Sequence, residues 1–261
     1  MTQPELSIQL YSVREALAAD LPGTLERLAG AGLRNAEAFG FVGRAAQMRA
    51  AADAAGLAVP SGHAQFLTPA EDAPPLGRVL DDAAALGITT LIDPMVAPDR
   101  WAARDEVEKT AALLNAAADE AAARGIRLGY HNHSQEFHHT IDGVPALELF
   151  AGLLDERVVL EVDVFWAAIG RQDVPALLRR LGDRVRLLHA KDGVLGEDPF
   201  LGGDFGGLDQ RVAGEGDLDL PAILAAAPAA EFAVIEFDAY DGDLFDAIAR
   251  SAVALRAEGV R

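Results

Sequence analysis

Cysteine is absent from the 261-residue chain, and basic residues are scarce, with 22 Lys and Arg against 41 Asp and Glu. Without cysteine there is no disulfide, no thiolate ligand for a metal and no cysteine nucleophile. A formal charge of −19 argues against nucleic acid and anionic membranes as partners, because both require a basic surface. The sequence therefore predicts no nucleic-acid partner and no membrane partner.

Long apolar runs are also missing. No segment approaches the ~18 consecutive apolar residues of a transmembrane helix, and residues 1–5 lack the basic-then-apolar layout of a signal peptide. Hydrophobic residues still make up 51% of the chain, which is enough for a large buried core. We expect a cytoplasmic globular protein.

Short apolar segments of strand length alternate with longer Ala- and Leu-rich helical patterns along the whole chain, and glycines mark the turns between them. The predicted strands are Ser7–Tyr11, Asn35–Phe39, Ala58–His63, Thr89–Asp93, Ile126–His131, Val158–Asp163, Val185–Ala190 and Phe232–Phe237. The predicted helices are a stretch around Glu26–Ala29, then Arg44–Ala55, Leu76–Leu86, Asp105–Arg124, Pro145–Leu154, Val174–Leu181, Leu220–Ala227 and Leu244–Arg256.

This alternation predicts an α/β protein with a (β/α)8 TIM barrel. The length fits one large domain, and no linker or low-complexity segment divides the chain, so residues 1–261 are expected to form a single domain. A doubly wound open sheet is the alternative. It is disfavoured because no GxGxxG motif follows the first predicted strand.

Residues 192–218 depart from the regular alternation, with many Gly and Asp residues and little periodicity. Such a long loop in a compact domain is uncommon and often functional. We expect it to leave the carboxyl end of the seventh strand, on the face where barrels carry their active sites.

Polar residues end most of the predicted strands, and in a barrel these ends converge at one mouth. The residues concerned are Gln9, Tyr11, Glu37, His63, Asp93, His131, His133, Glu161, Asp163, His189, Lys191 and Glu236. Because side chains alternate along a strand, Glu161 is expected one layer beneath Asp163. Histidine with carboxylates suits a divalent ion such as Mn²⁺, Co²⁺, Mg²⁺ or Zn²⁺. The predicted metal ligands are Asp163, His189 and Glu236, with His131 either a fourth ligand or a buried histidine behind the site.

Other aromatic and histidine residues are harder to assign. Trp166, just beyond Asp163, is either packed beneath a loop or a wall for a sugar ring, whereas Trp101 is expected to pack on a helix. His138 and His139 are expected to be exposed loop residues.

Several segments in a fixed order resemble one superfamily. They are IQLYSVR (8–14), YHNHSQEF (130–137), LEVDVFWAAIG (160–170), LLHAKDG (187–193), GEGDLDLPAIL (214–224) and VIEFD (234–238). Together they resemble the xylose isomerase-like TIM-barrel superfamily, in its sugar phosphate isomerase/epimerase branch with inosose dehydratase and isomerase and keto-glycoside-processing relatives. The similarity runs from the first predicted strand to the last.

The resemblance implies one divalent cation held by Glu, Asp, His and Glu from strands five to eight. Asp163, His189 and Glu236 match the last three positions, but His131 stands where the family has Glu. In the related epimerases the two glutamates form an acid/base pair around the substrate carbon. The absence of one of these glutamates favours elimination over epimerisation. If a second acid/base group is needed, His131, His133 or Glu136 would have to supply it.

The resemblance also implies roles for the other polar residues. Glu236 is the expected base, with His133 or Glu136 as acid partner, and Lys191 stabilises an oxyanion or orients hydroxyls. The expected substrate contacts are Gln9, Glu37, His63 and Trp166. For Gln9 and Glu37 the alternative is a hydrogen-bonded position in the barrel floor.

The first functional hypothesis is a divalent-metal-dependent isomerase or epimerase of a sugar, keto-sugar or inositol, acting through an enediolate. The second is a metal-dependent lyase or dehydratase of a keto-sugar, inosose or 3-keto-glycoside. A carbohydrate-binding barrel without catalysis is the non-enzyme alternative. A DNA-repair endonuclease is opposed by the charge and by an expected lack of extra His and Glu ligands for a multi-metal cluster. The expected partner is a small carbohydrate, and a homodimer is one expected assembly.

Overall fold

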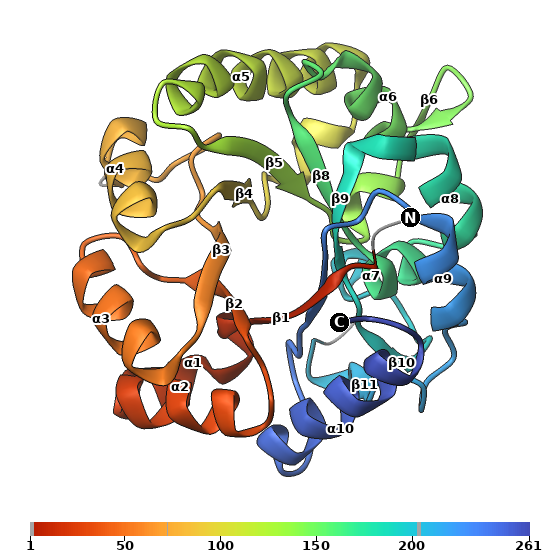
Figure 1. Ribbon diagram of the computed structural model, residues 1–261. Helices are drawn as coiled ribbons and strands as arrows, with labels where there is room; N and C mark the ends of the chain where they lie inside the picture. Colours follow the sequence, from red (N-terminus) through yellow and green to blue (C-terminus); the bar gives the residue numbers. More distant parts are fainter. Residues whose placement is uncertain (1–2, 72, 203–204) are drawn as a thin grey trace.

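The computed structural model describes residues 3–71, 73–202 and 205–261, and eight of its strands close into a parallel barrel (Figure 1). The strands are β1 (Glu5–Gln9), β2 (Asn35–Phe39), β3 (Ala58–His63), β4 (Thr90–Asp93), β5 (Arg127–His131), β8 (Val159–Asp163), β9 (Val185–His189) and β12 (Phe232–Ile235). Their order around the barrel, β1-β12-β9-β8-β5-β4-β3-β2, follows the chain. The predicted (β/α)8 architecture is confirmed, and the open sheet is excluded.

Helices form the outer ring around these strands (Figure 1). They are α1 (Arg14–Ala19), α2 (Leu21–Gly30), α3 (Ala45–Ala55), α4 (Leu76–Leu86), α5 (Arg104–Ala122), α6 (Ala146–Leu153), α7 (Val164–Ile169), α8 (Val174–Leu181), α9 (Leu220–Ala226) and α10 (Leu244–Ala257). Helix α5 shows why the apolar periodicity succeeded as a predictor. Its buried face includes Val107, Ala111, Leu114 and Ala118, which recur at helical spacing and pack toward the barrel.

The first βα connection differs from the prediction. Strand β1 ends at Gln9, and Leu10–Val13 form a 3-10 turn, so Tyr11 is not a strand residue. The side chain of Gln9 accepts a hydrogen bond from the backbone N–H of Tyr11 and so stabilises this turn. Two helices then follow where one was expected, because Asp20 ends α1 and caps α2 by accepting from the N–H of Gly23.

The connections at the carboxyl ends hold further structure. A two-stranded hairpin, β6 (Thr140–Ile141) and β7 (Val144–Pro145), lies between β5 and α6. Residues 192–218 leave β9 as predicted, and they contain the antiparallel pair β10 (Asp192–Val194) and β11 (Asp209–Arg211). We call residues 192–218 the insertion.

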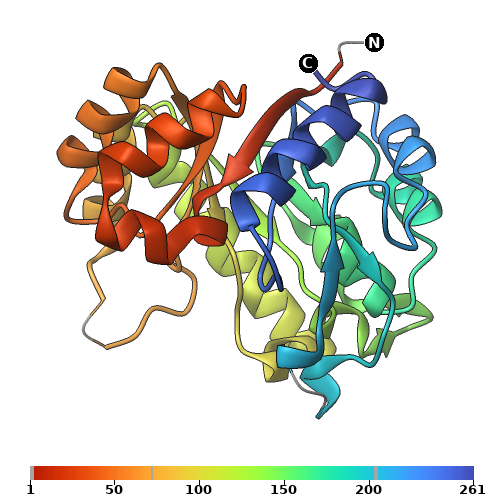
Figure 2. The ribbon, with the colours of Figure 1, turned by 90° about the horizontal axis from the view of Figure 1, so that it is seen from below.

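Figure 2 shows both chain termini at one end of the barrel and the insertion at the other. The loop after β3 extends from the same end as the insertion, so the carboxyl-end face carries the longest connections. None of the helices in the described residues is long and apolar enough to cross a membrane.

Candidate metal centre and pocket

Four neighbouring strands bring the predicted metal ligands together. His131 ends β5, Asp163 ends β8, His189 ends β9 and Glu236 follows β12 directly. Each of these residues is buried and offers one ligand atom, and these atoms all lie within 4.8 Å of one another. The group can therefore surround a single small cation.

The electrostatics of the four residues suit this arrangement. Burial, reinforced by neighbouring cationic groups, holds the pKa of His131 well below its usual value, which leaves the ring neutral with a lone pair to donate. Burial opposes ionisation of Glu236, but Lys191 and His189 outweigh it and lower its pKa. Burial raises the pKa of Asp163 to about 6 against the effect of Lys191.

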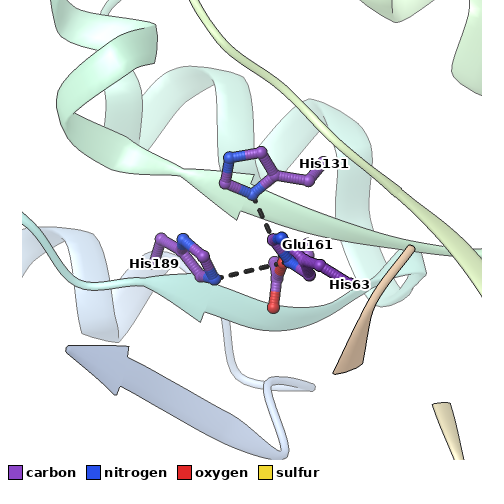
Figure 3. A group of neighbouring side chains, drawn as sticks. All are labelled: His63, His131, Glu161 and His189. Atoms are coloured by element: carbon purple, nitrogen blue, oxygen red, sulfur yellow. Dashed lines mark hydrogen bonds and ion pairs between the residues drawn. The ribbon is translucent and has the colours of Figure 1, made fainter. Parts of the chain in front are cut away.

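A second group of possible ligands overlaps the first (Figure 3). It consists of His63, His131, Glu161 and His189, again with ligand atoms within 4.8 Å of one another. Oε2 of Glu161 lies 2.5 Å from Nε2 of His63 and 3.2 Å from Nε2 of His189. The expected lack of extra His and Glu ligands is therefore wrong. His63 escaped notice as a ligand because it comes from β3, across the barrel from β9.

Acidic groups outnumber cations in and beneath the barrel mouth. The buried or half-buried carboxylates there belong to Glu37, Glu161, Asp163, Glu236 and Asp238. Lys191 lies among them, with Nζ 2.9 Å from Oδ2 of Asp163, 2.7 Å from Oε2 of Glu236 and 2.8 Å from Oδ2 of Asp238. Burial alone would lower the pKa of Lys191, but these carboxylates raise it well above its usual value.

Two imidazoles balance the remaining negative charge. Burial would lower the pKa of His63, but Glu37 and Glu161 raise it to about 10. Burial acts in the same direction on His189, and Glu161 and Glu236 raise its pKa well above the usual value. A histidine binds a metal only as the neutral ring, so a divalent cation would compete with these protons.

Unsatisfied polar atoms give an independent test of whether a cation fits. In the described part of the chain, Nδ1 of His131 and Oε1 of Glu161 are buried without a hydrogen-bond partner, although Nδ1 of His131 lies 3.3 Å from Oε2 of Glu161. Such atoms are rare in folded proteins and call for an explanation. A bound cation would satisfy them, so the donor set fits a divalent metal.

Asn132 fixes one of the ligands through the backbone. Its side-chain Oδ1 accepts from the N–H of Asp163 at 3.1 Å, and its Nδ2 donates to the carbonyl of Asp163 at 3.3 Å. The amide thus ties the end of β8 to the end of β5. The sequence reasoning missed this residue, although it lies inside the HNH motif.

A cavity of about 880 Å³ opens above the metal ligands. Of the predicted site residues, His63, His131, His133, Trp166 and Glu236 line it, and Gln9, Glu37, Glu136, Asp163, His189 and Lys191 do not. The lining also includes Tyr11, Arg14, Phe39, Phe41, Phe200, Phe205, Leu208 and Asp238. Arg14 and Asp238 were not predicted, although both lie within segments that carry the resemblance.

Gln9 and Glu37 occupy the barrel floor, which was the alternative to substrate contact. Both are fully buried, and Nε2 of Gln9 donates to Oε1 of Glu37 at 2.7 Å. The same carboxylate oxygen lies 2.8 Å from Nε2 of His189. Burial disfavours its charge, but His63 and His189 hold the pKa of Glu37 well below its usual value.

Glu136 folds back from its loop, but not into the cavity. Its carboxylate accepts from Oη of Tyr130 at 2.7 Å and from the backbone N–H of His133 at 2.8 Å. Burial raises the pKa of Glu136 to about 7. This position argues against the expected role as acid partner, because the carboxylate holds the backbone at His133 and does not line the cavity.

Two aspartates fix the insertion: Asp192 ties its beginning to its end, and Asp198 joins it to the loop after β5. Asp192 accepts from the backbone N–H groups of Gly214, Gly216 and Leu218. Asp198 accepts from Oγ of Ser134 and lies 2.8 Å from Nε2 of His138. His138 is thus partly buried, contrary to the prediction, because the insertion covers it. The remaining loop histidine, at position 139, is exposed as expected.

Comparisons with known proteins agree with this geometry. A sequence profile described as xylose isomerase-like TIM barrel matches residues 26–252. A search of curated proteins gives no match. A sugar phosphate isomerase/epimerase from Parabacteroides distasonis is 25% identical, with a TM-score of 0.79, and the alignment covers 98% of this chain and 95% of that one.

Two more distant structures share the fold. A xylose isomerase-like TIM barrel protein from Mycobacterium smegmatis, in complex with magnesium, is 15% identical over 98% of this chain and 97% of its own, with a TM-score of 0.72. The probable 3-DHS dehydratase AsbF from Bacillus anthracis is 11% identical over 97% and 98%, with a TM-score of 0.74. The profile match and the barrel together establish that the chain belongs to the xylose isomerase-like TIM-barrel family.

Proposed function

We propose that the protein is a divalent-metal-dependent isomerase or epimerase of a sugar, keto-sugar or inositol. The convergence of His131, Asp163, His189 and Glu236, two of which (His131 and Glu236) line the cavity, carries this proposal. The 25% identical neighbour from Parabacteroides distasonis, a sugar phosphate isomerase/epimerase, supports the reaction class.

The metal would be held by these four residues, with Mn²⁺, Co²⁺, Mg²⁺ and Zn²⁺ as candidates. When bound, it supplies Lewis acidity that polarises a substrate carbonyl and stabilises the enediolate formed by loss of the α-proton. The Mycobacterium smegmatis neighbour in complex with magnesium supports a divalent cation in this fold.

The side chains divide the remaining work. Glu236 lines the cavity and takes the proton from the carbon next to the carbonyl. His133 lines the cavity from the β5 side, three strands away from β12, and is placed to face the substrate from another direction. Lys191 lies beneath the lining, where its charge stabilises Glu236 and Asp163 as anions. His63 and Trp166, which also line the cavity, contact substrate.

A metal-dependent lyase or dehydratase is the second candidate, and one observation favours it. At the end of β5 and in the loop after it (residues 131–139), the ionisable side chains that line the cavity are the imidazoles of His131 and His133, and the carboxylates that line it, Glu236 and Asp238, both follow β12. A pair of carboxylates on two sides of one carbon is therefore missing, and elimination needs only one strong base. The probable dehydratase among the structural neighbours belongs to this class.

Product analysis in D₂O distinguishes the two. The Mn²⁺-loaded protein is incubated with a panel of ketoses, keto-sugars and inososes, and the mixture is examined by mass spectrometry. An isomerase or epimerase incorporates deuterium without losing any group, whereas a lyase or dehydratase releases water or an aglycone. Glu236→Gln removes either activity, and the exposed Asp241→Asn serves as the matched control. Binding of sugars without any turnover would instead favour the carbohydrate-binding barrel.

A further inference from the structure

The cavity above the metal ligands is large and unevenly polar. Its volume of about 880 Å³ is near the upper end of the ~300–1,000 Å³ typical of sites for drug-sized ligands. A single sugar ring occupies only a fraction of such a space. The rest of the cavity therefore has room for another part of the substrate.

Most of the ionisable lining residues gather close to the strand ends, and Tyr11 and Arg14 after β1 and Gln65 after β3 line the cavity as well. His63 ends β3, His131 and His133 lie at and just beyond the end of β5, and Glu236 and Asp238 follow β12. They surround the candidate metal centre. Hydroxyl groups and a carbonyl are recognised there, because that is where hydrogen-bonding partners are found.

The outer cavity has apolar walls on opposite sides of the barrel. One wall follows β2 and includes Phe39 and Phe41, and the other consists of Trp166 with Phe200 and Leu208 from the insertion. Strands β2 and β8, which precede these walls, are four positions apart in the closed ring of eight. Two aromatic faces across a gap are suited to a flat apolar group.

Aromatic contacts hold each wall in place. The ring centroids of Trp166 and Phe200 are 5.5 Å apart, and those of Tyr11 and Phe39 are 5.0 Å apart in an edge-to-face arrangement. Phe205, which packs on Phe200, leaves 51% of its surface exposed at the rim of the cavity. An exposed aromatic beside an apolar cavity is a surface that a ligand can cover.

Two polar atoms mark the junction between the polar and apolar parts. In the described residues, Nε1 of Trp166 and Nδ1 of His133 are buried without a hydrogen-bond partner, and both rings line the cavity. Their centroids are 5.6 Å apart. The imidazole of His133, on the polar side of the cavity, therefore lies directly beside the indole of the apolar wall.

We propose that the substrate is a sugar or cyclitol derivative that bears an apolar, ring-sized substituent, such as an aryl glycoside, with the substituent between the two aromatic walls. This inference rests on the proposed function for the polar half of the cavity only. An oligosaccharide is disfavoured, because its outer sugars would need hydrogen-bonding partners where the walls are apolar.

Calorimetric titration of the Mn²⁺-loaded protein tests the substrate class. The probes are matched pairs of methyl and phenyl β-glycosides of glucose, galactose and xylose. In at least one pair the phenyl glycoside is expected to bind about tenfold tighter or more, with a negative heat-capacity change from burial of the ring. Equal affinities within every pair, or no binding of any phenyl glycoside, would overturn the inference.

Variants locate the preference within the structure. Phe200→Ala and Leu208→Ala are expected to lower the phenyl-to-methyl affinity ratio at least threefold, while Leu201→Ala, which alters an exposed side chain of the same insertion outside this cavity, leaves it unchanged. A ratio unaffected by both wall variants would also overturn the inference. If Mn²⁺ alters neither affinity, the proposed metal-dependent function fails. The phenyl-to-methyl affinity ratio still shows, independently of the metal, whether the cavity binds an apolar substituent.

Discussion

The ammonium nitrogen of Lys191 lies 2.7 Å from Oε2 of Glu236, the carboxylate to which we assign both ion binding and proton transfer. The same nitrogen is 2.9 Å from Oδ2 of Asp163, a second proposed ligand. Lys191 therefore shares its partners with the metal centre. Its fully buried side chain acts through charge and not through contact with the cavity.

Replacement of this lysine is expected to make stability depend on the cation. Lys191→Met leaves buried carboxylates without their partner, which typically costs about 3 kcal/mol or more in the free energy of unfolding. The loss is expected in EDTA and is reduced by Mn²⁺, as measured by urea unfolding. Lys109→Met, at an exposed ion pair, is the control and leaves the midpoint unchanged. An equal loss with and without Mn²⁺ would contradict the shared-partner account.

Asn132 is expected to influence metal affinity without touching the metal. Asn132→Ala removes two hydrogen bonds to the backbone of Asp163, and loss of such support typically weakens metal binding by about 10- to 100-fold. Asn115→Ala is a matched control, because Asn115 also makes two backbone hydrogen bonds, to Leu153 and Asp155, away from the site. Titration with Mn²⁺ compares the two variants, and similar affinities would refute the role of Asn132.

Asp192 is expected to be essential for the insertion. It accepts several backbone hydrogen bonds, and a Cβ on Gly216 would lie within 2.2 Å of its Oδ1, so no larger residue fits there. Asp192→Ala is expected to lower the free energy of unfolding by about 2 kcal/mol or more and to expose the insertion to protease. Asp209→Asn, at an exposed ion pair of the same segment, provides the comparison. Unchanged proteolysis of the Asp192 variant would contradict this assignment.

The buried carboxyl of Glu136 predicts a pH dependence of stability. Burial raises its pKa from 4.5 to about 7, so between these values the folded protein holds a proton that the unfolded chain releases. The contribution of Glu136 to the free energy of unfolding is therefore fully present below pH 4.5, and it falls as the pH rises toward 7. Glu136→Gln keeps a neutral group at this position. It is expected to abolish the decrease in the free energy of unfolding that Glu136 causes between pH 4.5 and 7, which is about 3 kcal/mol by linkage. Parallel pH profiles of thermal unfolding for both proteins would contradict the assignment.

The sequence predicted the barrel well because short segments of strand length alternate regularly with helical patterns, and six of the eight barrel strands end at a polar residue. It also predicted that His131, Asp163, His189 and Glu236 would meet, since neighbouring strand ends must converge. The placement of Glu161 one layer beneath Asp163 is an expectation from strand alternation, and in the structure Glu161 is the register partner of His131 on the neighbouring strand.

The parts that could not be predicted depend on contacts between distant segments. Glu136 was expected in the cavity, but the hydroxyl of Tyr130 and the N–H of His133 hold it beneath. The bond between Asp198 and Ser134 joins loops after different strands, and no local pattern encodes it. Asn132 and Asp192 act on backbone groups, which carry no residue-specific signal.

Metal content of the purified protein tests the central claim most directly. Plasma mass spectrometry is applied to the wild type, Asp163→Ala and Glu236→Ala, with circular dichroism to verify that each variant is folded. The account predicts one divalent ion per chain in the wild type and its loss in both variants. A folded wild type that binds no divalent ion, or variants that retain it in full, would contradict the account.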